Sequence, residues 1–196
     1  MKLILASNSP RRREILTNAG YLFKTVVSGY PEREEKGDPA ATAKENALGK
    51  AKDVFDKLTE EEKTITAVLG ADTVVFIEGK ILGKPKDAED AKNMLRYLSA
   101  KTHEVVTGYS LVCARSVATG KSVSEVTFNF LSEELIESYV KSGAPMDKAG
   151  AYGIQDGFTI VAGYTGEFEN VMGLPIKDIK PLLKNCGIEN VAKGAL

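Results

Sequence analysis

The sequence is poor in the residue types on which several common site chemistries depend. Its 196 residues include no tryptophan, one histidine (His103) and two cysteines (Cys113 and Cys186). One histidine excludes a histidine-rich zinc site and leaves a Ser-His-Asp arrangement with a single candidate. We expect His103 to be a structural, hydrogen-bonded residue. Two cysteines without metal-type spacing predict no disulfide framework and favour a reducing compartment.

An excess of charge of one sign and long apolar runs are also missing. The formal net charge of −1 argues against a general nucleic-acid binder, because such proteins usually carry a marked basic excess. Interleaved basic and aromatic residues, which single-strand binders use, are also lacking. No run approaches the roughly 20 apolar residues of a membrane span, and the opening MKLILAS is too short for a signal peptide. We therefore expect a cytoplasmic protein that binds neither nucleic acid nor membrane.

Helical and strand-like patterns mix along the whole chain. Strands are predicted at residues 2–6, 23–28, 64–82, 103–115 and 121–131, the third with a break at 70–72 and a hairpin turn at 78–79. Helices are predicted at residues 10–18, 39–58, 88–98 and 133–141. The polar loop 29–38 is the one weak candidate for a boundary between lobes. This mixture predicts an α/β fold, with a mixed sheet and flanking helices, in a single domain over residues 1–196.

Three consecutive arginines follow the predicted start of the first helix. Ser9 and Pro10 are a typical N-cap and first helical residue. Arg11, Arg12 and Arg13 come next, although the positive end of the helix dipole disfavours cations there. A bound phosphate would resolve the conflict by accepting hydrogen bonds from the helix N–H groups and from one or two guanidinium groups. The alternative is a solvated basic face, above all for Arg13, because consecutive helical side chains point about 100° apart.

A carboxylate follows the apolar run AVL in the motif GADT. If this run is a central strand, Asp72 lies near its carboxyl end, where open α/β sheets bind ligands. Asp72 could there hold a divalent metal or orient a water for attack on phosphorus. The alternative is a turn or capping residue. Glu32 is a possible partner for Asp72 at a metal. Composition alone does not distinguish Glu32 from its neighbours Glu34 and Glu35.

The motif DKAGAYGIQ, residues 147–155, combines small residues with one amide. The small residues would let the backbone approach a flat ligand, while Gln155 offers the donor and acceptor that a uracil or thymine edge needs. The alternative is a tight connection with Tyr152 in the core. Asp147 and Lys148 fit either a salt-bridged turn or the surroundings of a phosphate.

Two lysines could neutralise a polyphosphate. Lys50 lies in the second predicted helix and Lys84 lies in the motif LGKP, although either could equally be a surface lysine. The sequence contains neither GxxxxGK[ST] nor GxGxxG. It therefore supports neither a Walker-type NTPase nor a dinucleotide-binding fold.

Five motifs in order, SNSPRRRE, GADT, LGKP, DKAGAYGIQ and VMGLPI, resemble the Maf family of nucleoside triphosphate pyrophosphatases over nearly the whole chain. The resemblance implies a fold of the Maf and inosine triphosphatase type, with two lobes around a cleft, and a homodimer. It also implies hydrolysis of a nucleoside triphosphate to the monophosphate and pyrophosphate, with Mg²⁺ or Mn²⁺ as cofactor.

The resemblance further implies a role for individual residues. The branch of the family that acts on dTTP and UTP carries the residues found here at Arg11, Arg12, Thr73 and Gln155, and base-modified pyrimidine triphosphates stay open as further substrates. By the same matching, Asp72 is the catalytic carboxylate, Glu32 its partner at the metal, and Lys50 and Lys84 contact phosphates. The segment after Gln155 departs from the glycine-rich form that is common in the family.

A different class of function remains open at this point. Maf proteins are associated with septum formation, so a non-catalytic nucleotide-binding regulator of cell division is the alternative. Such a sensor would need the arginines and Gln155 but would not need Asp72 with a metal. The presence of the carboxylates favours the enzyme, in which water attacks the α-phosphorus and pyrophosphate leaves.

Overall fold

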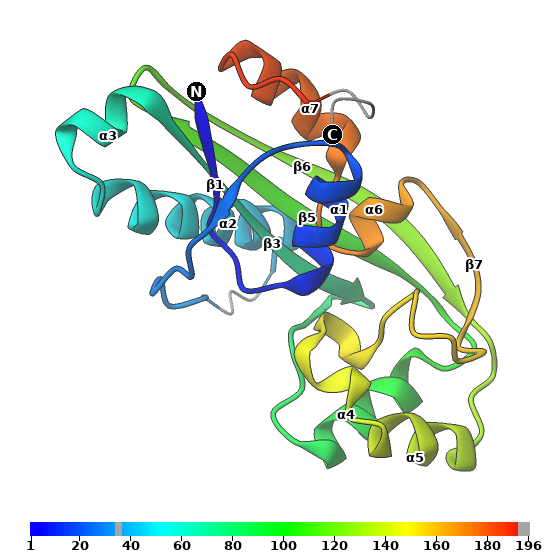
Figure 1. The fold of residues 1–196 in the computed structure, drawn as a ribbon. Helices are drawn as coiled ribbons and strands as arrows, with labels where there is room; N and C mark the ends of the chain where they lie inside the picture. Colours follow the sequence, from blue (N-terminus) through cyan, green and yellow to red (C-terminus); the bar gives the residue numbers. More distant parts are fainter. Residues whose placement is uncertain (34–36, 192–196) are drawn as a thin grey trace.

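A curled mixed sheet forms the centre of the structure, a computed structural model that describes residues 1–33 and 37–191 (Figure 1). Within these residues the sheet has seven strands in the order β2-β1-β3-β5-β6-β7, with β4 paired to β3. The strands are β1 (Lys2–Leu5), β2 (Lys24–Thr25), β3 (Thr66–Ile77), β4 (Lys80–Leu82), β5 (Thr102–Cys113), β6 (Ser116–Phe128) and β7 (Val161–Thr165). This architecture confirms the predicted α/β class.

The edge of β3 is covered in two separate stretches. β1 pairs with it in parallel as far as Leu5 and Leu69, and β4 pairs with it antiparallel from Val75 onward. Between these stretches, residues 70–74 pair with β5 on the other side, and no described strand lies on the open side. Two expectations are therefore wrong. β3 is continuous through residues 70–72, and Asp72 lies midway along β3 rather than near its carboxyl end.

The predicted interruption lies in the strands that pair with the edge of β3 and not in β3 itself. Gly70 instead allows a helix to pack closely on the sheet. Helix α2 (Pro39–Asp56) crosses one face of the sheet, and a Cβ at Gly70 would lie 2.2 Å from the carbonyl oxygen of Ala47. A Cβ at Gly108 would lie 2.3 Å from that of Ala43. Glycine in the strands and alanine in the helix thus allow a backbone approach that larger residues would prevent. This approach brings the side chains of α2 down to β3.

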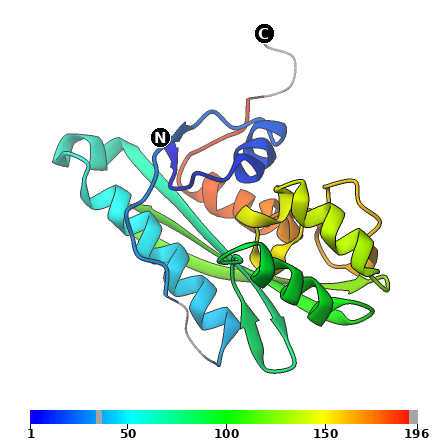
Figure 2. The same ribbon diagram turned by 90° about the horizontal axis from the view of Figure 1, so that it is seen from below.

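The opposite face of the sheet carries two groups of helices. Helices α1 (Pro10–Asn18), α6 (Phe168–Val171) and α7 (Ile176–Asn185) lie over one end. Their core contains fully buried leucines from helix, strand and loop, namely Leu5, Leu16, Leu69, Leu174 and Leu183. Helices α4 (Ala88–Leu98) and α5 (Glu133–Lys141), with the 3-10 turns Ala144–Asp147 and Ala149–Ala151, lie over the other end and form the second lobe (Figure 2). The cleft opens between these two groups.

The predicted helix starts are well matched by the structure. Helices α1 and α2 begin at the expected prolines, with Ser9 and Asp38 as N-caps. Helices α4 and α5 have the predicted bounds. A short helix, α3 (Glu60–Ile65), was not predicted, although Thr59 and Glu62 form a capping box at its start.

Two other predictions of local structure were not confirmed. Strand β2 is shorter than predicted because β1, its partner, ends at Leu5. Part of the loop 29–38, with Glu34 and Glu35, lies outside the described residues.

Cys113 and Cys186 are free thiols whose sulfur atoms lie 3.8 Å apart. Within residues 1–33 and 37–191, no helix has the length and apolar character needed to cross a membrane.

Candidate active site

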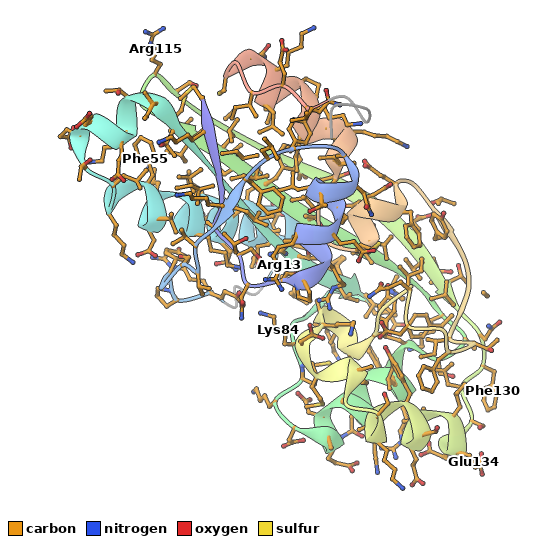
Figure 3. The ribbon with its side chains drawn as sticks, in the orientation of Figure 1. Arg13, Phe55, Lys84, Arg115, Phe130 and Glu134 are labelled. Atoms are coloured by element: carbon orange, nitrogen blue, oxygen red, sulfur yellow. The ribbon has the colours of Figure 1, made fainter. Side chains whose placement is uncertain are left out.

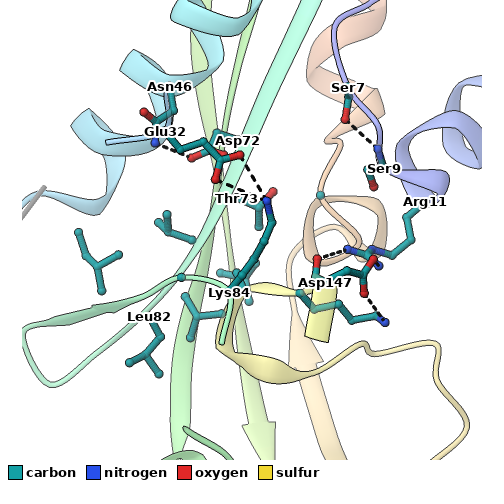
Figure 4. Close-up of a pocket in the computed structure, with 18 of the residues that line it drawn as sticks. Ser7, Ser9, Arg11, Glu32, Asn46, Asp72, Thr73, Leu82, Lys84 and Asp147 are labelled. Atoms are coloured by element: carbon teal, nitrogen blue, oxygen red, sulfur yellow. Dashed lines mark hydrogen bonds and ion pairs between the residues drawn. The ribbon is translucent and has the colours of Figure 1, made fainter. Parts of the chain in front are cut away.

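A cavity of about 1150 Å³ lies at the open stretch of β3, between the two lobes (Figure 4). Its walls come from the turn before α1, from α2, from β3 and the β3–β4 hairpin, and from the segment after α5. All of the predicted site residues line it: Arg11, Arg12, Glu32, Lys50, Asp72, Thr73, Lys84 and Gln155. Successive side chains of a strand point to opposite faces, so Asp72 faces α2 while Thr73 faces α1. The open edge of β3 lets one cavity reach both.

Asp72 is held in place by two side chains of α2. Its Oδ1 accepts a hydrogen bond of 2.6 Å from Nζ of Lys50, and its Oδ2 accepts one of 3.0 Å from Nδ2 of Asn46. Asn46 also bonds the backbone N–H and carbonyl of Arg33, so it ties the loop before α2 to the carboxylate. Asp72 is 6% exposed and Lys50 is 7% exposed. The carboxylate is therefore both fixed and nearly withdrawn from solvent.

Glu32 lies on the opposite side of the same lysine. Its Oε1 is 2.7 Å from Nζ of Lys50 and 3.4 Å from Nζ of Lys84. Burial opposes ionisation of Glu32, but the charges and hydrogen bonds of the two lysines outweigh it and lower the pKa of Glu32 to about 2. Lys50 thus bridges the two carboxylates, and Lys84 reaches in from the turn after β4 (Figure 3).

Arg11 extends from the first turn of α1 across the cleft. Its Nη1 donates to Oδ2 of Asp147 at 2.9 Å, and Lys148 lies 3.1 Å from the other oxygen of that carboxylate (Figure 4). Burial favours the neutral form of Asp147, but Lys148 and Arg11 outweigh it and lower its pKa. The ion pair therefore joins the two lobes. Asp147 and Lys148 form a salt-bridged turn, as one of the two alternatives expects, and both line the cavity.

Arg12 lines the cavity, but its guanidinium points at backbone carbonyls of the protein. Its Nε donates to the carbonyl of Gly173 at 2.7 Å and its Nη1 to that of Ala71 at 2.8 Å. Further contacts go to the hydroxyls of Ser7 and Thr73. These contacts use four of the five N–H donors of a guanidinium. At the carbonyl of Ala71, the guanidinium of Arg12 supplies a hydrogen bond on the edge of β3 where no described strand pairs.

The remaining predicted residues differ in how they are placed. The hydroxyl of Thr73 contacts Arg12 and Thr107, so it helps to hold the arginine. Arg13 is exposed on α1 (Figure 3), as the solvated-face alternative expects. Gln155 is exposed at the cavity, and its Nε2 donates to Oδ1 of Asp156 at 3.1 Å.

The segment around Tyr152 is a tight connection, as one of the two alternatives expects. Tyr152 is 5% exposed, and its hydroxyl lies 2.8 Å from Nε2 of His103. The prediction that His103 is structural and hydrogen-bonded is therefore confirmed, and burial lowers its pKa to about 4. The backbone N–H of Gly150 donates to the carbonyl of Gly83, which joins this segment to the turn that bears Lys84.

Comparison with known proteins identifies the family of this chain. A family model described as Maf-like protein matches residues 2–186. The chain belongs to this family. A dTTP/UTP pyrophosphatase of Aquifex aeolicus (strain VF5) is 44% identical over 189 residues, which cover 96% of this chain and 97% of that protein. The protein of the same name from Escherichia coli O157:H7 is 41% identical over 184 residues, which cover 93% of this chain and 92% of that protein.

The two predicted metal ligands of this Maf-family chain are oxygen donors on either side of one ammonium group. Among residues 1–33 and 37–191, no group of three or more histidine, cysteine, aspartate or glutamate side chains is arranged to hold a metal ion. Mg²⁺ is usually bound by one or two carboxylates, with substrate phosphates and waters as the other ligands, and Mn²⁺ also prefers oxygen. Glu32 and Asp72 supply carboxylate oxygens, the donor type that such a cation prefers.

Sequence reasoning missed Asn46 and the role of Asp147. Asn46 and Lys50 are four residues apart in KENALGK, so they lie on one face of the helix. That spacing could have indicated a polar pair on the buried side of α2. Nothing in the sequence could have indicated that Asp147 meets Arg11, which is 136 residues away.

Proposed function

We propose that this protein hydrolyses dTTP and UTP, with base-modified pyrimidine triphosphates, to the monophosphate and pyrophosphate. The observation that carries the proposal is the buried Asp72 carboxylate at the floor of a cavity whose other charged side chains are mainly cationic. Lys50 and Asn46 fix its two oxygens. The relatives that cover nearly the whole chain are named dTTP/UTP pyrophosphatase.

The cationic groups around the cavity suit a triphosphate. Lys50 and Lys84 approach from the α2 side and Arg11 from the α1 side. The start of α1 adds backbone N–H groups and the positive end of its dipole. Fixed positive groups of this kind stabilise the charge that develops on a leaving pyrophosphate. A bound phosphate would make Arg11 favourable at the helix start, whereas Arg12 is held by backbone carbonyls.

In the proposed reaction the oxygen of a water molecule attacks the α-phosphorus. The bond between this phosphorus and the oxygen that bridges to the β-phosphate breaks, and pyrophosphate leaves with the bonding electrons. Asp72 orients the water and accepts its proton, since a carboxylate held by Lys50 and Asn46 presents its remaining lone pairs in fixed directions. Glu32 and Asp72 would hold Mg²⁺ or Mn²⁺, which when bound neutralises phosphate oxygens and polarises the phosphorus.

The decisive experiment is product analysis by chromatography. The protein is incubated with dTTP or UTP and Mg²⁺ or Mn²⁺, with and without chelator, beside Asp72→Asn. Asp56→Asn is the matched control, because Asp56 is an exposed residue at the end of α2. We expect metal-dependent monophosphate and pyrophosphate that are lost in Asp72→Asn and retained in Asp56→Asn.

Two other outcomes would contradict the proposal. Orthophosphate with a nucleoside diphosphate would mean that a different bond is cleaved. Nucleotide binding without turnover, under all metal conditions, would instead support the regulator of cell division.

We further propose, from the family resemblance, that the protein is a cytoplasmic homodimer. Light scattering coupled to gel filtration tests the dimer. A mass near the 21.1 kDa of one chain would contradict it.

A further inference from the structure

The amide of Gln155 is oriented by the residue that follows it. Its Nε2 lies 3.1 Å from Oδ1 of Asp156. An ionised carboxylate accepts hydrogen bonds and donates none, so it selects the amide nitrogen rather than the amide oxygen as its neighbour. One N–H of Gln155 and its carbonyl oxygen therefore remain for a ligand, in a fixed order.

Asp156 is itself held in place by Tyr139 and Lys148. Its Oδ2 accepts a hydrogen bond of 2.5 Å from the hydroxyl of Tyr139 and lies 3.3 Å from Nζ of Lys148. Tyr139 is fully buried, and its hydroxyl also accepts from the backbone N–H of Gly153 at 2.9 Å. The Asp156 side chain is only 11% exposed. The carboxylate is therefore a rigid part of the second lobe, although Gln155 itself lies in an exposed turn.

A fixed amide distinguishes pyrimidines that differ in the order of their donors and acceptors. Uracil and thymine present an N–H at position 3 beside a carbonyl oxygen at position 4. Cytosine presents the reverse, an acceptor at position 3 beside an amino group at position 4. The carbonyl and remaining N–H of Gln155 can match one order as they stand. To match the other, the amide would have to turn by about 180° and place its oxygen against Asp156, where two acceptors would meet.

We propose that Asp156 is a positioning residue that selects uracil and thymine against cytosine by fixing the amide of Gln155. The inference rests on the proposed function, because it concerns the base of the same substrate. Asp156 acts through Gln155 and does not contact the reacting phosphates.

The test compares kcat/KM for UTP and CTP in the wild type and in Asp156→Asn. In Asp156→Asn the Tyr139 hydroxyl and Nζ of Lys148 hold the asparagine oxygen at the place of Oδ2, so its amino group faces Gln155 and favours the turned glutamine amide. Leaving a polar group unmatched weakens the binding of the mismatched base. Since Gln155 is exposed, we expect the UTP to CTP ratio to fall by about tenfold, mainly through a lower KM for CTP.

Asp147→Asn is the matched control. It removes the charge of the other carboxylate beside Lys148 and so weakens the ion pair with Arg11, but it leaves the contact between Gln155 and Asp156 intact. We expect it to change the rates for both triphosphates by the same factor and to leave the ratio unchanged. Tyr139→Phe removes only the hydroxyl that holds Asp156, and should lower the ratio less than Asp156→Asn does. It provides a second test if Asp156→Asn does not fold.

A double-mutant cycle separates positioning from general damage. In a Gln155→Met background there is no amide to orient, so adding Asp156→Asn should leave the UTP to CTP ratio where Gln155→Met put it. Affinities for the non-hydrolysable α,β-methylene analogues of UTP and CTP, measured by calorimetry, should show the same pattern without any turnover.

The possible results separate the two proposals. If the wild type converts neither UTP nor dTTP to a monophosphate, the proposed function fails. If it does so, but Asp156→Asn and Tyr139→Phe lower the rates for UTP and CTP equally, the function stands and the role of Asp156 is overturned. A change in ratio that is equally large with and without Gln155 would also overturn it.

Discussion

The ammonium nitrogen of Lys50 lies 2.6 Å from Oδ1 of Asp72, and each of the two side chains is only 9% exposed. The pair joins α2 to the middle of β3, at the stretch where no described strand covers the edge of β3. It also places a positive charge between two carboxylates, because Oε1 of Glu32 lies 2.7 Å from the same nitrogen. Lys50 therefore contributes both to the packing of α2 on β3 and to the arrangement of charges in the cavity.

Removing this lysine should reduce both stability and activity. In Lys50→Met the Asp72 carboxylate would be left buried without its cation, which typically costs about 3–5 kcal/mol. Urea denaturation would measure the loss. Lys52→Met, an exposed change two residues along the same helix, should alter the free energy of unfolding little. The double variant Lys50→Met with Asp72→Asn should be more stable than Lys50→Met alone, and a less stable double variant would contradict the pairing.

Gly70→Ala should separate α2 from the sheet. The added Cβ would lie 2.2 Å from the carbonyl oxygen of Ala47 and 2.9 Å from the backbone nitrogen of Ala51. Since backbone cannot yield as a flexible side chain does, we expect a loss of about 1–3 kcal/mol in the free energy of unfolding. Turnover should also fall, because Lys50 moves away from Asp72. Gly163→Ala, where a Cβ meets nothing within 4 Å, is the control, and equal effects of the two changes would refute the explanation.

Arg12 and Arg13 should respond differently to the same conservative change. Arg12→Lys keeps the charge but cannot reproduce the planar contacts with the carbonyls of Gly173 and Ala71. Leaving these acceptors unmatched should cost about 1–3 kcal/mol, measured as a lower thermal midpoint. Arg13→Lys on the exposed face should leave the midpoint unchanged. If the two variants have the same thermal midpoint of unfolding, Arg12 does not hold α1 to β3.

His103 should make stability depend on pH. Burial lowers its folded pKa to about 4 from an ordinary 6.5, so the unfolded chain binds the proton more readily. The contribution of the neutral imidazole to stability is therefore complete above pH 6.5, falls as the pH falls, and is lost near pH 4. The shift corresponds to about 3 kcal/mol over this window.

Denaturant titrations across the same window would measure the slope for His103. The difference between wild type and His103→Gln should account for it, since glutamine does not titrate. Parallel curves for the two proteins would show that His103 is not the responsible group.

The order of strands and helices could largely be predicted from the sequence. Caps followed by proline set the starts of α1 and α2, and glycine with a charged neighbour marked the hairpin after β3. These are local signals, carried by residues within a few positions of one another. The break predicted at Gly70 was wrong because the same glycine can mean a turn or a close helix, and the local sequence does not distinguish them.

The motifs also identified the residues that line the cavity, because each residue type limits the chemistry it can perform. The tertiary structure decided how those residues are used. It directs Arg12 into backbone carbonyls, pairs Arg11 with Asp147, and sets Lys50 between Glu32 and Asp72. Such pairings join residues far apart in the chain, and they depend on where strands end and how closely a helix approaches a sheet. The sequence by itself determined which groups are present, and only the packing decided which donor meets which acceptor.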